Sequence, residues 1–168
     1  MEQRILFVKI IRIFNIFAII IVMRRSIEKT RNLVSIELLN KGFWVYSNPK
    51  DKTTCHILCS NADMTKRVEI QVSQSSTTSR TWLLDEDIKD FPNDTFYILV
   101  GYKNPKFPDF FIVPLKIILD YTDPENKKWL SSTTKKYNTL HKDTHTRRFI
   151  IKTDERKEYL NHWDLLGL

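Results

Sequence analysis

Residues 68–76, with the sequence VEIQVSQSS, carry the side chains best suited to chemistry. Successive side chains of an extended strand point to opposite faces, so the apolar residues of this run share one face, and Glu69, Gln71 and Ser73 share the other. A carboxylate, an amide and a hydroxyl in one row are oxygen donors that suit a metal and phosphate site. The same row would equally solvate the open face of a sheet. The pattern alone supports both interpretations.

A basic region near the C-terminus is a second candidate site. Five of its cationic residues are Lys135, Lys136, Lys142, Arg147 and Arg148. Cations clustered in this way suit contact with phosphate groups, which positions a nucleic acid without reading its sequence. A solvated loop face is the alternative explanation of the cluster.

Two patterns of histidine and cysteine are incomplete as metal sites. His141 and His145 have the i, i+4 spacing of a metal-binding helix, yet Lys142 stands where a hydrolytic zinc helix places a glutamate. Cys55 and Cys59 have no second ligand pair at the spacing of a tetrahedral zinc site, and they lie too far apart along one strand for a disulfide. We therefore expect surface histidines, free thiols and a reducing, cytoplasmic setting.

The composition favours a folded domain with an anionic partner. The 168-residue chain is 42% hydrophobic and 28% charged, which is ordinary for one globular domain. Its net charge of +7 favours nucleic acid or an acidic membrane surface as the partner, although a lysine-rich composition alone also produces this charge. Because the chain has three glycines in all, we exclude a phosphate-cradling glycine loop.

The N-terminal residues form a hydrophobic extension, ILFVKIIRIFNIFAIIIV at residues 5–22. Its length suits a bilayer-spanning helix, but each charged residue within it costs about 2.5–3.5 kcal/mol near a bilayer centre. A membrane anchor, an amphipathic surface helix and an over-long gene start that precedes a true start at Met23 are the three interpretations. We favour the last, with residues 1–23 as an extension and residues 24–168 as a single domain. Membrane association through residues 5–22 is the alternative.

Helix and strand signals alternate along the rest of the chain. An apolar helical spacing that ends before Gly42 predicts a helix over residues 27–40. Strands are predicted at residues 43–47, 55–60, 68–72, 96–102 and 110–113. Short connections make the first three strands antiparallel, and a short helix at residues 83–91 allows the sheet to become mixed.

The C-terminal half adds helical signals. Helices are predicted at residues 115–121, 125–130 and 154–166, with an exposed loop at residues 131–142. The tryptophans Trp82, Trp129 and Trp163 each lie beside apolar residues and are predicted to pack in the core. Together the elements predict an α/β fold in which a central mixed β-sheet is flanked by helices.

The order and spacing of these elements resemble the PD-(D/E)XK nuclease superfamily, which has the restriction-endonuclease-like fold, over about residues 27–168. The segments that carry the likeness are SIELLNKGF, CHILCSN, VEIQV, Trp82, FYILV, FFIVP and NHWDLL. In such nucleases, the strand that matches residues 68–73 holds an acidic residue or a glutamine and, two positions on, a lysine. An aspartate on the preceding strand and, in some branches, a glutamate on the first helix complete an oxygen cage for Mg²⁺.

Carried over by position, the resemblance implies Glu37 and Gln71 as catalytic residues and metal ligands. It also places His56 where the aspartate is expected and Ser73 where the lysine is expected. A neutral imidazole is a poor ligand for Mg²⁺, and a hydroxyl cannot supply the fixed charge of an ammonium group. Two of the four catalytic roles are therefore altered.

Neighbouring residues offer two ways to restore these roles. Glu69 could lend a carboxylate, and Lys66 or Lys103 could lend the positive charge, after a shift of about 6–7 Å along a strand. The resemblance thus implies a nuclease-fold protein that binds nucleic acid, with DNA as the first choice, and has a degenerate metal site with weak or no activity. An active Mg²⁺-dependent endonuclease and a protein-interaction module on the same fold are the alternatives.

Overall fold

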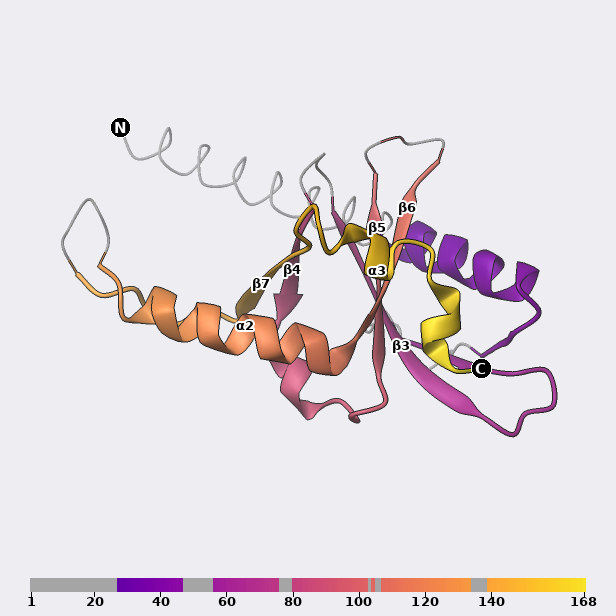
Figure 1. Cartoon of the computed structure of the whole chain (residues 1–168). Helices are drawn as coiled ribbons and strands as arrows, with labels where there is room; N and C mark the ends of the chain where they lie inside the picture. Colours follow the sequence, from indigo (N-terminus) through magenta and orange to yellow (C-terminus); the bar gives the residue numbers. More distant parts are fainter. Residues whose placement is uncertain (1–26, 47–55, 76–79, 103, 105–106, 134–138) are drawn as a thin grey trace, which may run out of the picture.

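A five-stranded mixed β-sheet forms the centre of the protein (Figure 1). The structure is a computed structural model that describes residues 27–46, 56–75, 80–102, 104, 107–133 and 139–168. The central strands, in spatial order, are β1 (Trp44–Tyr46), β2 (His56–Ser60), β3 (Arg67–Ser75), β5 (Phe96–Gly101) and β6 (Asp109–Pro114). All neighbours are antiparallel except β3 and β5, which are parallel. The predicted α/β class, with a mixed central sheet flanked by helices, is confirmed.

A helix over residues 27–40 covers one face of this sheet. Thr30, Val34 and Leu38 recur every four residues and are buried, and the two apolar ones pack into the core on the apolar side of β3. The chain leaves the helix through Gly42, whose φ of 86° is a left-handed conformation that glycine adopts at little cost. Both the helix and its end agree with the prediction.

A second sheet of two strands lies on the opposite side of the central sheet (Figure 1). β4 (Thr81–Asp85) pairs antiparallel with β7 (Thr146–Ile150), and α2 (Leu115–Leu130) packs beside β7. Trp82 of β4 and Phe149 of β7 are buried in a core that is separate from the one under helix 27–40. The central sheet therefore carries one apolar core on each face.

This second sheet departs from the sequence prediction. The pattern predicts a short helix at residues 83–91, whereas these residues form the end of β4 and the short 3₁₀ helix η1 (Glu86–Asp90). Trp82 and Leu84 alternate with exposed residues, which is the pattern of a half-buried strand, and the backbone partner of β4 is β7. A distant pairing partner thus decides the conformation of this segment.

Pro124 does not divide α2. The helix runs unbroken from Leu115 to Leu130, whereas the sequence predicts separate helices on either side of the proline. Pro124 and Asp120 are both exposed, so water can bond to the Asp120 carbonyl that proline leaves without a helical partner. The missing hydrogen bond is therefore tolerated on this face.

The C-terminal segment contradicts the predicted amphipathic helix at residues 154–166. It contains the short helix α3 (Arg156–Tyr159) and the 3₁₀ helix η2 (Trp163–Leu166). Between them Asn161 has a positive φ of 58° and donates its backbone N–H to the Phe110 carbonyl at 2.8 Å. This bond to β6 breaks the helix and brings the apolar side chains of η2 onto the core under helix 27–40.

The tryptophan and N-terminal predictions have mixed outcomes. Trp82 and Trp163 are buried as predicted, but Trp129, in the last turn of α2, is 38% exposed. The extension at residues 5–22 and the domain boundary at residue 23 lie outside the described residues. Within the residues that are described, no helix has the length and apolar character to cross a bilayer.

Cys59 of β2 provides a test of the core under helix 27–40. Its side chain is fully buried, and burial raises the pKa of the thiol to about 11. In a Cys55→Ser variant, which leaves Cys59 as the single thiol, alkylation at pH 8 should be at least about 100-fold slower in the folded protein than in urea. Because the thiol ionises more easily in the unfolded chain, stability should also fall as the pH rises from about 9 to 11. Equal alkylation rates in the two states would contradict this packing.

Candidate functional site

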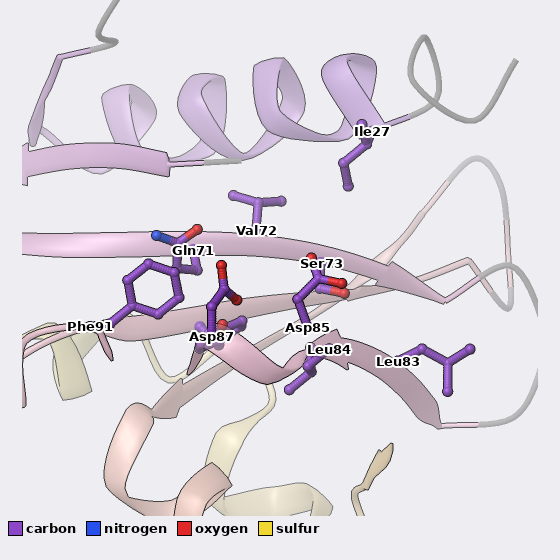
Figure 2. Close-up of a pocket in the computed structure, with 10 residues that line it drawn as sticks. Ile27, Gln71, Val72, Ser73, Leu83, Leu84, Asp85, Asp87 and Phe91 are labelled. Carbon is purple, nitrogen blue, oxygen red and sulfur yellow. The ribbon is translucent and has the colours of Figure 1, made fainter. Parts of the chain in front are cut away.

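The two faces of β3 have different partners. Val72 points toward helix 27–40, whereas the carboxylates of Asp85 and Asp87 approach β3 from the other side (Figure 2). Because side chains alternate along a strand, Gln71 lies on the side opposite to Val72. Gln71 therefore faces the β4 and η1 side of the sheet.

This arrangement corrects the predicted pairing of Glu37 with Gln71. Glu37 belongs to helix 27–40, which packs on the apolar face of β3, so the sheet lies between the two side chains. A cation needs ligands within about 2–2.6 Å, and ligands on opposite faces of a sheet cannot meet this requirement. The Mg²⁺ ion implied by the resemblance does not fit these two residues.

His56 and Glu69 share the Gln71 face of the sheet but interact with each other. His56 is the register partner of Gln71 in the β2–β3 ladder, and register partners lie on one face. The His56 Nε2 atom lies 3.4 Å from the Glu69 Oε2 atom, which gives an ion pair when the imidazole is protonated. Neither residue lines the cavity that contains the Gln71 side chain. Glu69 therefore does not restore the missing carboxylate beside Gln71.

Lys66, one of the two lysines proposed to restore the positive charge, does not reach the site either. The Lys66 ammonium donates a hydrogen bond to the Gly167 carbonyl at 3.0 Å, at the far end of the β2–β3 hairpin. Lys103 lies outside the described residues. Ser73 keeps its place two positions after Gln71 on the same face of β3, and both line one cavity.

A cavity of about 450 Å³ lies between β3 and the segment formed by β4 and η1 (Figure 2). Its polar lining consists of Gln71 and Ser73 from β3, Asp85 from β4, and Asp87 from η1. Apolar and aromatic side chains complete the wall, namely Ile27, Val72, Leu83, Leu84, Phe91 and Tyr97. The cavity is open to solvent at Asp85 and Asp87, which are exposed.

Asp85 and Asp87 were not among the predicted site residues. The alternation of β4 buries Leu84 and leaves Asp85 on the outer side, and η1 turns the chain around the buried Ile88 so that Asp87 follows on the same side. The only local signal was the acidic run DED that follows TWLL. Such a run gives no information about which strand it will face.

The basic region divides into a structural and a solvent-facing part. Arg147 is 6% exposed, lies 3.0 Å from Asp143 and 3.6 Å from Glu86, and donates a hydrogen bond to the Thr144 carbonyl at 2.6 Å. The predicted phosphate contact by Arg147 is therefore wrong, because its charge is buried and paired. Lys135 and Lys136 lie outside the described residues.

Arg148 and Lys142 remain available for an anionic partner. Arg148 follows Arg147 on β7, so it points to the other face of the strand, where it is exposed. It lines a second cavity of about 330 Å³, together with Tyr121 and Trp129 of α2. Lys142 is exposed in the preceding loop.

His141 and His145 do not form a metal pair. The residues between them are not helical, so the i, i+4 spacing does not bring the imidazoles to one side. His141 stacks on the Trp129 ring with the centroids 4.4 Å apart, and His145 contacts Glu86. In the described part of the chain, no three histidine, cysteine, aspartate or glutamate side chains form a group that could hold a metal ion.

Comparison with known proteins adds one distant neighbour. No protein-family model matches the chain, and no curated protein matches it. Among solved structures, the crystal structure of MepB is similar at a TM-score of 0.32 and 9% sequence identity, over 83% of this chain and 88% of MepB. A likeness of this degree supports no conclusion about family or function.

Proposed function

We propose that this chain is a nucleic-acid-binding protein of the restriction-endonuclease-like type whose hydrolytic site is degenerate. The observation that carries the proposal is the set of side chains on the Gln71 face of the sheet. His56 and Ser73 share this face with Gln71, at the positions where the resemblance implies an aspartate and a lysine. The three strand positions that the resemblance implies thus share one face of the sheet, but two of them hold other residue types.

The residues present are poorly equipped for hydrolysis. Metal-assisted hydrolysis of a phosphodiester needs a cation held by hard oxygen ligands and a nearby positive charge that stabilises the attacking hydroxide. His56 is held beside Glu69, and no lysine or arginine belongs to the described lining of the cavity. We therefore expect cleavage to be weak or absent.

Binding of a polyanion requires exposed cations, and β7 and the loop before it each offer one. Arg148 and Lys142 are exposed, and neither makes an ion pair within the described residues. The chain has an excess of seven positive charges, which favours association with a polyanion. DNA is the first choice of partner.

The salt dependence of DNA binding tests the proposal. Duplex DNA should bind the full chain with an affinity that falls linearly with ionic strength on a logarithmic plot, because bound phosphates release counterions. Arg148→Ala should weaken binding and lower this slope by about one. Lys41→Ala is the matched control, because Lys41 stacks over Trp163 on the opposite side of the central sheet and should leave the slope unchanged. Binding that does not respond to salt, or an equal loss in both variants, would contradict the proposal.

A plasmid-cleavage assay with Mg²⁺ or Mn²⁺ addresses the degenerate site. The wild-type protein should nick the plasmid no faster than a Gln71→Ala variant. Cleavage by the wild type that disappears in Gln71→Ala would instead support an active endonuclease.

A further inference from the structure

We infer that the cavity between β3 and the β4–η1 segment binds one divalent, oxygen-preferring metal cation, held by Asp85, Asp87 and Gln71. Asp85 and Asp87 are not among the residues that the resemblance to nucleases implies. The inference does not depend on nucleic-acid binding, and its test uses no nucleic acid.

Gln71 is the buried member of the site. Its side chain lines the cavity and is 7% exposed. Within the described residues, no hydrogen bond to its amide is found. Buried polar groups are nearly always bonded to protein, to water or to a ligand. An amide oxygen that faces a polar cavity is therefore available to a cation or to its hydration shell.

Asp85 and Asp87 supply the negative charge. Both carboxylates point toward β3 in Figure 2, and no ion pair or hydrogen bond to either is found within the described residues. Their acidic neighbour Glu86 behaves differently, because it contacts His145 and lies 3.6 Å from Arg147. The acidic run thus has one member that is neutralised by the protein and two that face the cavity without a counter-charge.

The chemistry of the lining selects the kind of ion. Every polar group named in the lining offers oxygen, and no cysteine or histidine is present among the described lining residues, which disfavours zinc. Two carboxylates match the charge of one divalent cation and repel an anion. Mg²⁺ and similar ions are commonly held by one or two carboxylates and keep several water molecules.

The size of the cavity suits a hydrated ion. A volume of about 450 Å³ accommodates a cation with its waters, since each water occupies about 30 Å³ in the liquid. The Ser73 hydroxyl lines the same space and can bond to such a water. The site is open at the two aspartates, so ions exchange with solvent directly.

Terbium luminescence measures this binding in the full chain. Tb³⁺ replaces Ca²⁺ and Mg²⁺ at oxygen sites, and Tyr97 in the cavity wall can sensitise its emission. Tb³⁺ should bind, and Mg²⁺ or Mn²⁺ should displace it. Asp85→Asn and Asp87→Asn should each weaken binding at least ten-fold. Asp90→Asn is the matched control, since Asp90 is an exposed aspartate of the same 3₁₀ helix outside the cavity lining, and its affinity should stay within two-fold of the wild type.

A Gln71→Glu variant tests whether Gln71 is a metal ligand or only a structural residue. A third carboxylate should tighten binding at least three-fold, and it should lower the melting temperature in EDTA but not in excess Mn²⁺. Unchanged affinity in both cavity aspartate variants would overturn the inference. Stabilisation by spermidine without any response to Mg²⁺ or Mn²⁺ would also overturn it, because the cavity would then prefer an organic cation. A failure of DNA binding would leave these readouts unaffected.

Discussion

Replacement of Trp82 by alanine should lower the free energy of unfolding by about 3–5 kcal/mol. Trp82 is 1% exposed, and its ring meets Phe111 edge to face with the centroids 5.5 Å apart. Its indole Nε1–H also donates a hydrogen bond to the Val100 carbonyl at 3.4 Å. Because Trp82 lies on β4 and both partners lie on the central sheet, alanine would leave a cavity between the two sheets. For a chain of this size, the melting temperature should fall by about 10–15 °C.

Two variants control this experiment. Trp82→Phe keeps an aromatic ring but loses the hydrogen bond to Val100, so it should cost less than half as much as alanine. Trp44→Ala removes a tryptophan that is 50% exposed on β1, at the edge of the sheet, and should cost less than about 1.5 kcal/mol. Equal losses for Trp44→Ala and Trp82→Ala in thermal or urea unfolding would contradict the described packing.

Arg147→Met should destabilise the protein by about 2 kcal/mol at neutral pH. The guanidinium is buried and holds Asp143, Glu86 and the Thr144 carbonyl, so it ties the loop before β7 to the start of η1. Methionine fills much of the volume but leaves these acceptors without a donor. Because Asp143 and Glu86 are partly exposed, water compensates for part of the loss, which keeps the cost below that of a fully buried pair.

The pH dependence of this variant follows from Asp143. Desolvation raises the pKa of Asp143, but hydrogen bonds from the Thr144 N–H and from Arg147 outweigh it, so the pKa lies below its ordinary value. The stabilisation is therefore present above the ordinary pKa and is lost as the pH falls through the lowered pKa. The stability difference between wild type and Arg147→Met should shrink below about pH 4. Arg148→Met is the control in urea unfolding, and its exposed side chain should cost less than about 0.5 kcal/mol.

Local patterns were sufficient to predict the elements around β3. Helix 27–40 and β3 each have a complete signal within a few turns or alternations, and short connections fix antiparallel pairing among β1, β2 and β3. The alternation of side chains along β3 also bears on the predicted pairing of Glu37 with Gln71. Helix 27–40 covers the apolar face of β3, and Gln71 points to the other face, so the central sheet separates the Glu37 side chain from the Gln71 side chain. The sequence pattern alone could therefore have excluded Glu37 as a metal ligand beside Gln71.

The pairing of strands that are far apart in the sequence could not be predicted. Asp85 and Asp87 face Gln71 because β4 pairs with β7, and no periodicity within either strand specifies a partner so far along the chain. Arg147 and Arg148 show the same limit. The two side chains are chemically identical, but which one is buried depends on which face of β7 turns toward the core that contains Trp82 and Phe149. Only the three-dimensional structure separates a structural arginine from an available one.

The pairing of β4 with β7 also determines when the protein can finish folding. Trp82 is in register with Phe149, so β4 must wait for β5, β6 and α2 to be synthesised before its partner exists. Contacts so distant in sequence form late, because closing a long loop costs entropy before any pairing repays it. On the ribosome, the antiparallel hairpins can assemble early. The wall that carries Asp85 and Asp87 becomes fixed only after the C-terminal strand has left the exit tunnel.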